Sequence, residues 1–212
     1  KKNYMNCLLT GGTGIVGSHI IFEWLRKAIV DKTVNHLYVV IRAHEKTAEE
    51  RLLAILKDKS RPEFLNNFTI EACLEKITVI SHDLESIDQT VLNKYNFDTV
   101  IHCAGSTSLL HTTDSKQIVH AQNYLVTKNL LEELPKNVKR FLYISTAYSF
   151  GIQDKKVNDT IDNYNVTNFR NPYEKSKYES EFYVKETCKL KNIDAQILRP
   201  SIICGRLLDA PF

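Results

Sequence analysis

Six short apolar runs, rich in β-branched and aromatic residues, recur along the chain, and each is followed by a polar or helix-like segment. Runs of this kind are typical of strands that are buried on both faces of a parallel sheet. Strands that alternate with helices favour an α/β fold, with helices packed on both sides of the sheet. We therefore predict a doubly wound parallel sheet whose strands occupy residues 6–10, 37–42, 76–81, 98–103, 140–146 and 195–200.

Start and stop signals define the helices between these strands. Thr47, followed three residues later by Glu50, forms a capping-box pattern at the start of one helix, and Pro172 stands in the first turn of another. A third helix is expected to end before Pro135. Residues 152–171 form the longest expected loop, and a long loop in a compact domain is usually functional or mobile. The predicted helices span residues 47–58, 115–134 and 172–190.

Length and composition are those of an ordinary globular domain. The 212 residues are 43% apolar and 25% charged, so we expect one domain over residues 1–212. No apolar run approaches membrane-spanning length and nothing resembles a secretory signal, which predicts a cytoplasmic protein. The net charge of +3 is small and dispersed, which argues against a nucleic-acid partner. The five cysteines show neither a disulfide framework nor metal-ligand spacing, so no metal is expected.

A glycine cluster follows the first predicted strand. Four of the seven glycines lie between Leu8 and His19, in a chain otherwise poor in glycine. Three of them, Gly11, Gly14 and Gly17, form G-x-x-G-x-x-G between a strand and a helix, which is the context of a Rossmann-type dinucleotide site. Glycine permits the tight turn and the close approach of a pyrophosphate, while the helix N-terminus supplies free N–H groups. The alternative is a glycine-rich turn that binds nothing. The expected cofactor contacts are Gly11, Thr13, Gly14, Ile15, Val16 and Gly17.

The end of the second strand indicates which dinucleotide is bound. NAD-binding proteins usually place an acidic residue there for the ribose 2′-hydroxyl, whereas this chain has Arg42. A guanidinium suits the 2′-phosphate of NADP, so we expect NADP(H), with NAD(H) less favoured. A surface arginine at a strand end is the alternative. Asp83 and Leu84, after the third strand, are expected on the adenine side, although a turn-forming role for Asp83 is nearly as well supported.

Tyr173 and Lys177 form the candidate catalytic pair. They are one helical turn apart and share a face, and a nearby ammonium favours the phenolate form of a tyrosine. The spacing alone proves little, because a second Tyr-x-x-x-Lys occurs at Tyr124 and Lys128. Position distinguishes the two copies. Only the Tyr173 copy follows a strand end that offers hydroxyls, so we expect Tyr124 to be a packed or surface residue.

These motifs, in this order, resemble those of the extended short-chain dehydrogenase/reductases, and the resemblance covers essentially the whole chain. It rests on TGGTGIVG, HDL, IHCAG, STAYSFG, YEKSK and LRPSIICG. Within that superfamily, VIRAHEKTAEERL resembles the branch of thioester reductases and fatty-acyl-CoA reductases. Members of that branch use NADPH to reduce an acyl group held as a thioester on a carrier protein or coenzyme A. The resemblance therefore implies an acyl substrate and an acyl carrier protein as a possible partner.

The resemblance also assigns roles to individual residues. Tyr173 would donate a proton to the substrate oxygen, Lys177 would hold the nicotinamide ribose and lower the pKa of Tyr173, and Thr146 would hydrogen-bond the same oxygen. Ser145 is a neighbouring hydroxyl that is easily confused with Thr146. Relatives continue into a substrate-binding portion soon after Gly205, which this chain would largely lack. Further cofactor contacts are implied for Ala104, Gly105, Asn123, Pro200 and Ser201.

Three functions remain open from the sequence. An NADPH-dependent reductase of an acyl thioester or a derived carbonyl is favoured by Arg42 and by the branch resemblance. A sugar-nucleotide epimerase or dehydratase shares the tyrosine–lysine pair, but would more typically retain NAD through an acidic residue. A non-catalytic NADP-binding regulatory protein is the third, and the complete set of Thr146, Tyr173 and Lys177 argues against it.

Overall fold

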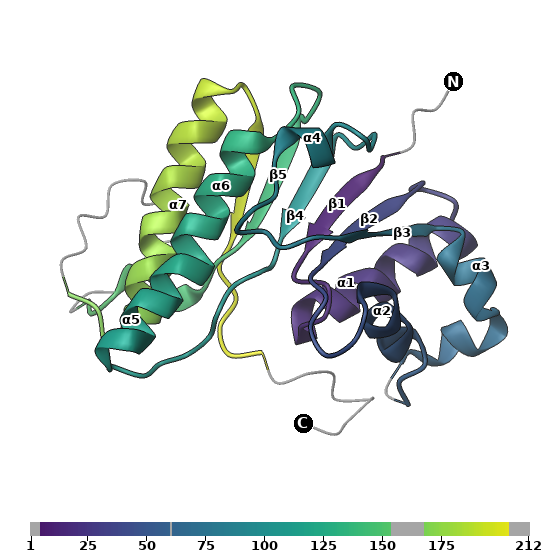
Figure 1. The fold of residues 1–212 in the computed structure, drawn as a ribbon, viewed down its shortest axis with the longest axis horizontal. Helices are drawn as coiled ribbons and strands as arrows, with labels where there is room; N and C mark the ends of the chain where they lie inside the picture. The colour runs from purple at the N-terminus through teal and green to yellow at the C-terminus, as the bar shows by residue number, and fades with distance from the viewer. Residues whose placement is uncertain (1–4, 60, 154–167, 204–212) are drawn as a thin grey trace.

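The computed structural model describes residues 5–59, 61–153 and 168–203. Its centre is a six-stranded sheet in the order β3-β2-β1-β4-β5-β6, with every neighbouring pair parallel (Figure 1). The doubly wound fold predicted from the sequence is confirmed, and all six strands are present. Their bounds are β1 Cys7–Thr10, β2 Leu37–Ile41, β3 Ile77–Ser81, β4 Thr99–His102, β5 Arg140–Ile144 and β6 Asp194–Leu198.

The helices alternate with these strands and agree with the predicted ones. Thr47 and Glu50 make both hydrogen bonds of the capping box, at 3.1 and 2.8 Å. The predicted helix over 115–134 begins two residues earlier and contains one π-helical turn, η3. The bounds are α1 Ile15–Leu25, η1 Arg26–Val30, α2 Ala48–Leu56, η2 Glu63–Asn67, α3 Ile70–Leu74, α4 Gln89–Leu92, α5 Thr113–His120, η3 Ala121–Leu125, α6 Val126–Glu133, η4 Ala147–Phe150 and α7 Pro172–Leu190.

Both faces of the sheet are covered by apolar cores. Leu8 and Leu9, adjacent on β1, are both fully buried but belong to two different clusters, because successive side chains of a strand point to opposite faces. The first cluster lies with α1, α2 and α3, and the second with α6 and α7. Figure 1 shows these two groups of helices on opposite sides of the sheet. β1 and β4 lie next to each other at the centre, where the strand order reverses.

This reversal point is where open α/β sheets bind their ligands, outside the carboxyl ends of the strands. The loops that follow β1, β2, β3 and β4 all leave the sheet at that edge because the strands are parallel. Most of the predicted loop 152–171 lies outside the described residues. None of the described helices is long and apolar enough to cross a membrane.

Candidate active site

A cleft of about 290 Å³ opens at the reversal point. It draws its walls from the loops after four strands, which are far apart in the sequence. Eight of the residues predicted to contact a cofactor line this cleft, so the structure brings them together as expected. They are Gly11, Thr13, Gly14, Arg42, Asp83, Leu84, Ala104 and Gly105.

The glycine loop forms the floor of the cleft. Gly11 has φ of +71°, a left-handed conformation that favours glycine, and a Cβ there would lie 2.6 Å from the carbonyl carbon of Cys103. A Cβ on Gly17 would overlap the carbonyl oxygen of Gly11, so Gly17 is needed for packing the helix on the loop. A Cβ on Gly14 would meet only that same oxygen, at 3.5 Å. Gly14 therefore leaves open space on the side where a ligand would approach.

The N-terminus of α1 follows this loop directly. Its N-cap, Gly14, has no side chain to satisfy the first N–H groups of the helix. Those groups fit the pyrophosphate of a dinucleotide. Ile15 and Val16 belong to this first turn, but their side chains line a separate apolar hollow beside Trp24 and Ile203. Only their backbone is suited to contact a cofactor in the cleft.

Arg51 is a cleft residue that sequence reasoning missed. Its guanidinium donates to the carbonyl oxygen of Arg42 at 2.6 Å and to Oγ1 of Thr13 at 3.1 Å. It therefore connects the loop after β2 to the glycine loop, and it lines the cleft with Arg42. The capping box was the available signal: it fixes the start of α2 at Thr47, which places residue 51 in the first turns beside the sheet edge.

Asp83 combines the two roles that the sequence left open. Its Oδ1 accepts a hydrogen bond from the backbone N–H of Glu85 at 3.0 Å, which is a turn-forming contact. It also lines the cleft beside Leu84. The carbonyl of Leu84 accepts from Nδ2 of Asn129 at 3.0 Å, so this loop is fixed to α6.

The second part of the site is the tyrosine–lysine pair on α7, and Lys177 is its buried member. Burial lowers the pKa of its ammonium to about 8, while neighbouring Tyr173 and Glu181 oppose that shift. The ammonium donates to the carbonyl oxygen of Ile144 at 2.6 Å. Tyr173 is half-buried, one helical turn before Lys177 on the same helix. A lysine whose pKa lies near neutrality is suited to take part in proton chemistry.

Asn123 joins the cleft to the catalytic helix. Its side chain accepts from the backbone N–H of Ser106 at 2.7 Å and donates to the hydroxyl of Ser176 at 2.8 Å. A Cβ on Gly105 would lie 2.6 Å from Oδ1 of Asn123 and 4.0 Å from Nζ of Lys177. The cofactor cleft and the tyrosine–lysine pair are therefore parts of one site.

The turn after β5 carries the candidate hydroxyls. Thr146 is buried, and its Oγ1 accepts from the backbone N–H of Tyr148 at 3.3 Å, which caps η4. The buried hydroxyl of Ser145 has no hydrogen-bond partner among the described residues. The carbonyl oxygen of Pro200 accepts from Ala147 N–H at 2.8 Å, which places Pro200 beside this turn. Ser201, next to it, is exposed.

A directed chain of hydrogen bonds runs beneath the site, and sequence reasoning missed it. The Thr127 hydroxyl donates to the carbonyl of Asn123 at 2.6 Å, so it must accept from Nε2–H of His102 at 2.9 Å. Nδ1 of His102 is then an acceptor, and it receives the hydroxyl proton of Thr10 at 2.6 Å. Burial lowers the pKa of His102 to about 3 and keeps the ring neutral. This chain connects the end of β1 to the π-turn that holds Asn123.

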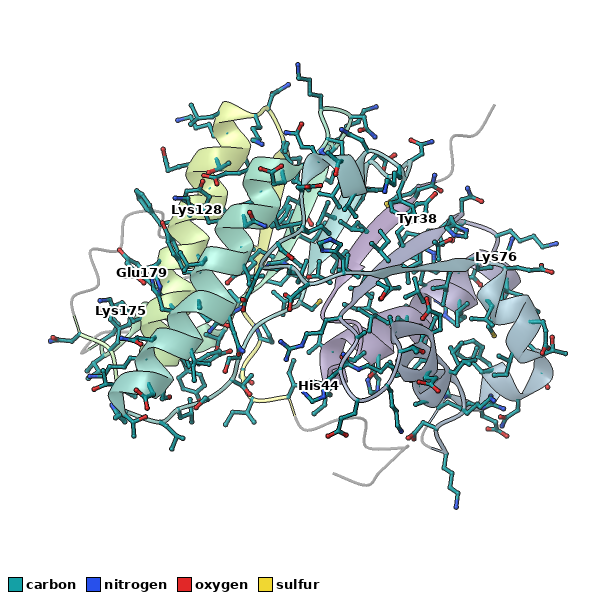
Figure 2. All side chains as sticks on the ribbon, viewed as in Figure 1. Tyr38, His44, Lys76, Lys128, Lys175 and Glu179 are labelled. Carbon is teal, nitrogen blue, oxygen red and sulfur yellow. The ribbon has the colours of Figure 1, made fainter. Side chains whose placement is uncertain are left out.

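In the second Tyr-x-x-x-Lys copy, Tyr124 is packed against neighbouring rings, as predicted. The Tyr124 ring packs edge-on against Tyr183 with centroids 5.9 Å apart, and it also contacts His120. Lys128 lies 3.9 Å from the Glu132 carboxylate in the helical layer, where Figure 2 labels it. Among the described residues, no group of three or more His, Cys, Asp or Glu is arranged to hold a metal ion.

Fold and site together define the class of protein. A parallel sheet with the order 3-2-1-4-5-6, a glycine loop at the reversal point and a Tyr-x-x-x-Lys pair on the helix after β5 are the features of an NAD(P)-binding extended short-chain dehydrogenase/reductase. More narrowly, a family model described as male sterility protein matches residues 9–211. The chain belongs to this family, which confirms the branch resemblance seen in the sequence. Membership of this family supports a nicotinamide dinucleotide as its cofactor.

Individual relatives are more distant. Mouse UDP-glucose 4-epimerase is 25% identical over 190 residues, covering 86% of this chain and 48% of that protein. Mouse fatty acyl-CoA reductase 1 is 28% identical over 164 residues, covering 68% of this chain and 28% of that protein. The chain thus spans about half the length of the epimerase and a smaller share of the reductase. The terminal R domain from the myxalamid PKS-NRPS biosynthetic pathway superimposes with a TM-score of 0.75 at 22% identity, covering 93% of this chain and 49% of that one.

Proposed function

We propose that this chain is the cofactor-binding and catalytic part of an NADPH-dependent reductase that acts on an acyl thioester or a carbonyl derived from it. The observation that carries the proposal is the cleft in which Arg42 and Arg51 stand beside the glycine loop, continuous with Lys177 through Gly105 and Asn123. The acyl group would be presented on a carrier protein or on coenzyme A. Family membership and the likeness to a fatty acyl-CoA reductase support this substrate class.

Two guanidinium groups at one end of the cleft support the choice of NADPH. A 2′-phosphate carries negative charge and several acceptor oxygens, which arginine can grip with paired N–H groups. Arg51 is already oriented by Thr13 and by the Arg42 carbonyl, so little side-chain freedom would be lost when it binds a phosphate. An acidic residue at the end of β2, which would bind the ribose hydroxyl of NAD, is replaced by Arg42.

The residues of this chain divide the chemistry between them. The bound nicotinamide supplies a hydride. Tyr173 donates a proton to the oxygen of the substrate carbonyl, and Thr146 hydrogen-bonds that oxygen as negative charge develops on it. Lys177 holds the cofactor ribose and keeps a positive charge beside the Tyr173 hydroxyl. Its pKa of about 8 leaves it protonated at neutral pH.

Calorimetry of NADPH and NADH binding tests the cofactor. We expect NADPH to bind more tightly, and Arg51→Gln and Arg42→Ala each to weaken NADPH binding by about 1.5–3 kcal/mol while leaving NADH binding nearly unchanged. Arg61→Gln is the matched control, because Arg61 bonds to Leu56 and Asn66 away from the cleft. Equal affinities of the wild-type protein for the two cofactors would contradict the proposal.

A substrate panel tests the reaction in the full-length protein. NADPH is supplied with acyl-CoA, carrier-bound thioesters, free aldehydes and nucleotide sugars, and absorbance loss and products are followed. Turnover of thioesters should fall by about 10²–10⁴ in Tyr173→Phe and stay unchanged in Tyr124→Phe, the matched second copy. Reduction of aldehydes alone would narrow the activity to a carbonyl reductase. Loss of turnover in Tyr124→Phe would show that the catalytic tyrosine is misassigned.

A sugar-nucleotide epimerase or dehydratase is the second candidate. The likeness to UDP-glucose 4-epimerase over 86% of this chain favours it, and such an enzyme would use the same tyrosine and lysine. The panel separates the two reactions, because an epimerase would convert nucleotide sugars without net consumption of NADPH. A purely regulatory NADP-binding role is the weakest alternative, since it gives no reason to bury a lysine with a lowered pKa beneath Tyr173.

A further inference from the structure

The Lys177 ammonium is a buried charge without a carboxylate partner. Only 5% of the residue is exposed, and among the described residues no ion pair joins it to an acidic group. Glu181, one helical turn after Lys177 on α7, is held instead by the Arg199 guanidinium, whose Nη2 donates to Oε2 at 2.7 Å and whose Nε donates to Oε1 at 3.1 Å. An isolated ammonium in a protein interior loses its proton unless something else stabilises the charge.

Within the described part of the chain, two groups contact this ammonium. One is the carbonyl oxygen of Ile144, at 2.6 Å. The other is the aromatic ring of Tyr143, whose centroid lies 4.4 Å from Nζ of Lys177. That distance is well within the range at which the negative face of an aromatic ring attracts a cation, and the attraction is strongest at sites shielded from water. Both contacts come from the end of β5.

Tyr143 is fully buried, and its hydroxyl does not explain its presence. The hydroxyl has no hydrogen-bond partner of good geometry among the described residues, and burial raises its pKa, so it stays neutral. The ring is stacked against that of His102, with centroids 5.7 Å apart and planes inclined by 21°. Because burial keeps His102 neutral, Lys177 is the one cation beside the ring among the residues that the structure describes.

We propose that Tyr143 is a positioning residue that holds the Lys177 ammonium charged and directed toward Tyr173 by presenting its aromatic face to it. The role rests on the proposed function only in that Lys177 serves Tyr173. The other titratable groups around the ammonium are Tyr173 and Glu181 on α7 and Cys103 and His102 at the end of β4. Tyr173, Glu181 and Cys103 favour the charged form of Lys177, whereas burial opposes it.

Removal of the ring should therefore deprotonate Lys177 near neutral pH. The direct measurement is an NMR titration of the lysine Cε and Nζ resonances, with the Lys177 signal assigned by its absence in Lys177→Met. We expect Tyr143→Leu to lower the Lys177 pKa by about one unit or more, as the loss of a water-shielded cation–π contact implies. Tyr143→Phe, the matched control, keeps the ring and should leave the pKa close to that of the wild type.

A second set of variants keeps the packing constant in case Tyr143→Leu does not fold. Phenylalanines with increasing ring fluorination at position 143 reduce the negative charge of the ring face with little change of shape. The Lys177 pKa should fall stepwise with fluorination. An unchanged Lys177 pKa across the series, or an equal shift in Tyr143→Phe and Tyr143→Leu, would overturn the proposal and leave Tyr143 with a packing role only.

The activity readout is separate from this titration. If the full-length protein reduces a thioester, the basic limb of its kcat/KM profile against pH should move to lower pH in Tyr143→Leu and stay in place in Tyr143→Phe. If no thioester is reduced, the proposed function fails, but the NMR titration still decides the role of Tyr143, because it needs no substrate.

Discussion

The two halves of the sheet bury different kinds of residue. In the half built from β1, β2 and β3, the core beneath the cleft is apolar. Thr10 is the single buried polar residue of that half in the described part of the chain. In the half built from β4, β5 and β6, many polar and charged side chains are buried. They are Thr99, His102, Ser115, Asn123, Thr127, Ser145, Thr146, Ser149, Glu174, Ser176, Lys177, Ser180 and Glu181.

This difference follows from what each half has to do. The first half offers an anion the N–H groups of a glycine loop and a helix N-terminus, together with arginines at the surface of the cleft. None of those groups needs a polar core. Proton transfer, by contrast, needs ionisable groups out of water and in fixed positions, and each of them must be satisfied by a neighbour. The second half is therefore expected to be optimised for chemistry at some expense of stability.

The largest effect is expected in the first half, where two glycines of one motif should respond differently. Gly17→Ala would push a methyl group into the Gly11 backbone, so it should destabilise the protein by more than about 3 kcal/mol or prevent folding. Gly14→Ala has ordinary van der Waals room and should fold normally, but its methyl group should weaken dinucleotide binding. Chemical denaturation and calorimetry measure the two effects. Equal stability of both variants would show that the loop is not close-packed on α1.

Lys177→Met tests the second half, where the substitution is expected to raise stability rather than lower it. The folded-state pKa of Lys177, about 8, lies below the 10.5 of an exposed lysine, so the wild-type protein carries the full cost of the buried charge below pH 8. Lys177→Met should raise the free energy of unfolding at pH 7 by up to about 3 kcal/mol and abolish turnover. The wild type should gain stability between pH 8 and 10.5, and Lys177→Met should lack that rise. A destabilised Lys177→Met would mean that the ammonium contributes to folding.

The first half was also the easier one to predict from sequence. Glycine spacing, the strand end at Arg42 and the Thr47 cap are local patterns, and all of them have the expected structures. Tyr173 and Lys177 were predicted from a motif and Thr146 from the family resemblance, but the groups that surround them were not predicted. Tyr143 and His102 look like ordinary strand residues in the sequence, and their roles depend on contacts with Lys177 and Thr127 that no local pattern encodes. Arg51 was overlooked because its partners lie 9 and 38 residues away.

The buried His102 chain predicts acid sensitivity that originates in the second half. The folded-state pKa of His102, about 3, is far below the usual 6.5, so only the unfolded state takes up this proton as pH falls below 6.5. The contribution of His102 to stability is therefore complete above pH 6.5 and should fall by about 2 kcal/mol by pH 5. Denaturation of His102→Gln at pH 7 and 5 should show a smaller pH dependence. His36→Gln is the control, because His36 is less buried and its pKa is lowered less.

The smallest effect concerns two helix caps, one in each half, that make the same kind of hydrogen bond. Thr47 accepts from Glu50 N–H at the start of α2 at 3.1 Å, and Asn171 accepts from Glu174 N–H at the start of α7 at 2.9 Å. Either residue replaced by Ala should lose about 1 kcal/mol of stability, as caps generally do. Their functional effects should differ, because α2 carries Arg51 and α7 carries Tyr173 in its first turn.

Thr47→Ala should therefore raise the dissociation constant of NADPH more than that of NADH, since fraying of α2 loosens only the group proposed to bind the 2′-phosphate. Asn171→Ala should leave that ratio unchanged and lower turnover instead, since fraying of α7 displaces the tyrosine hydroxyl. Calorimetry with both cofactors and turnover in the full-length protein measure the two effects. If both caps altered the cofactor ratio alike, the division between an anion-binding half and a proton-transferring half would not hold.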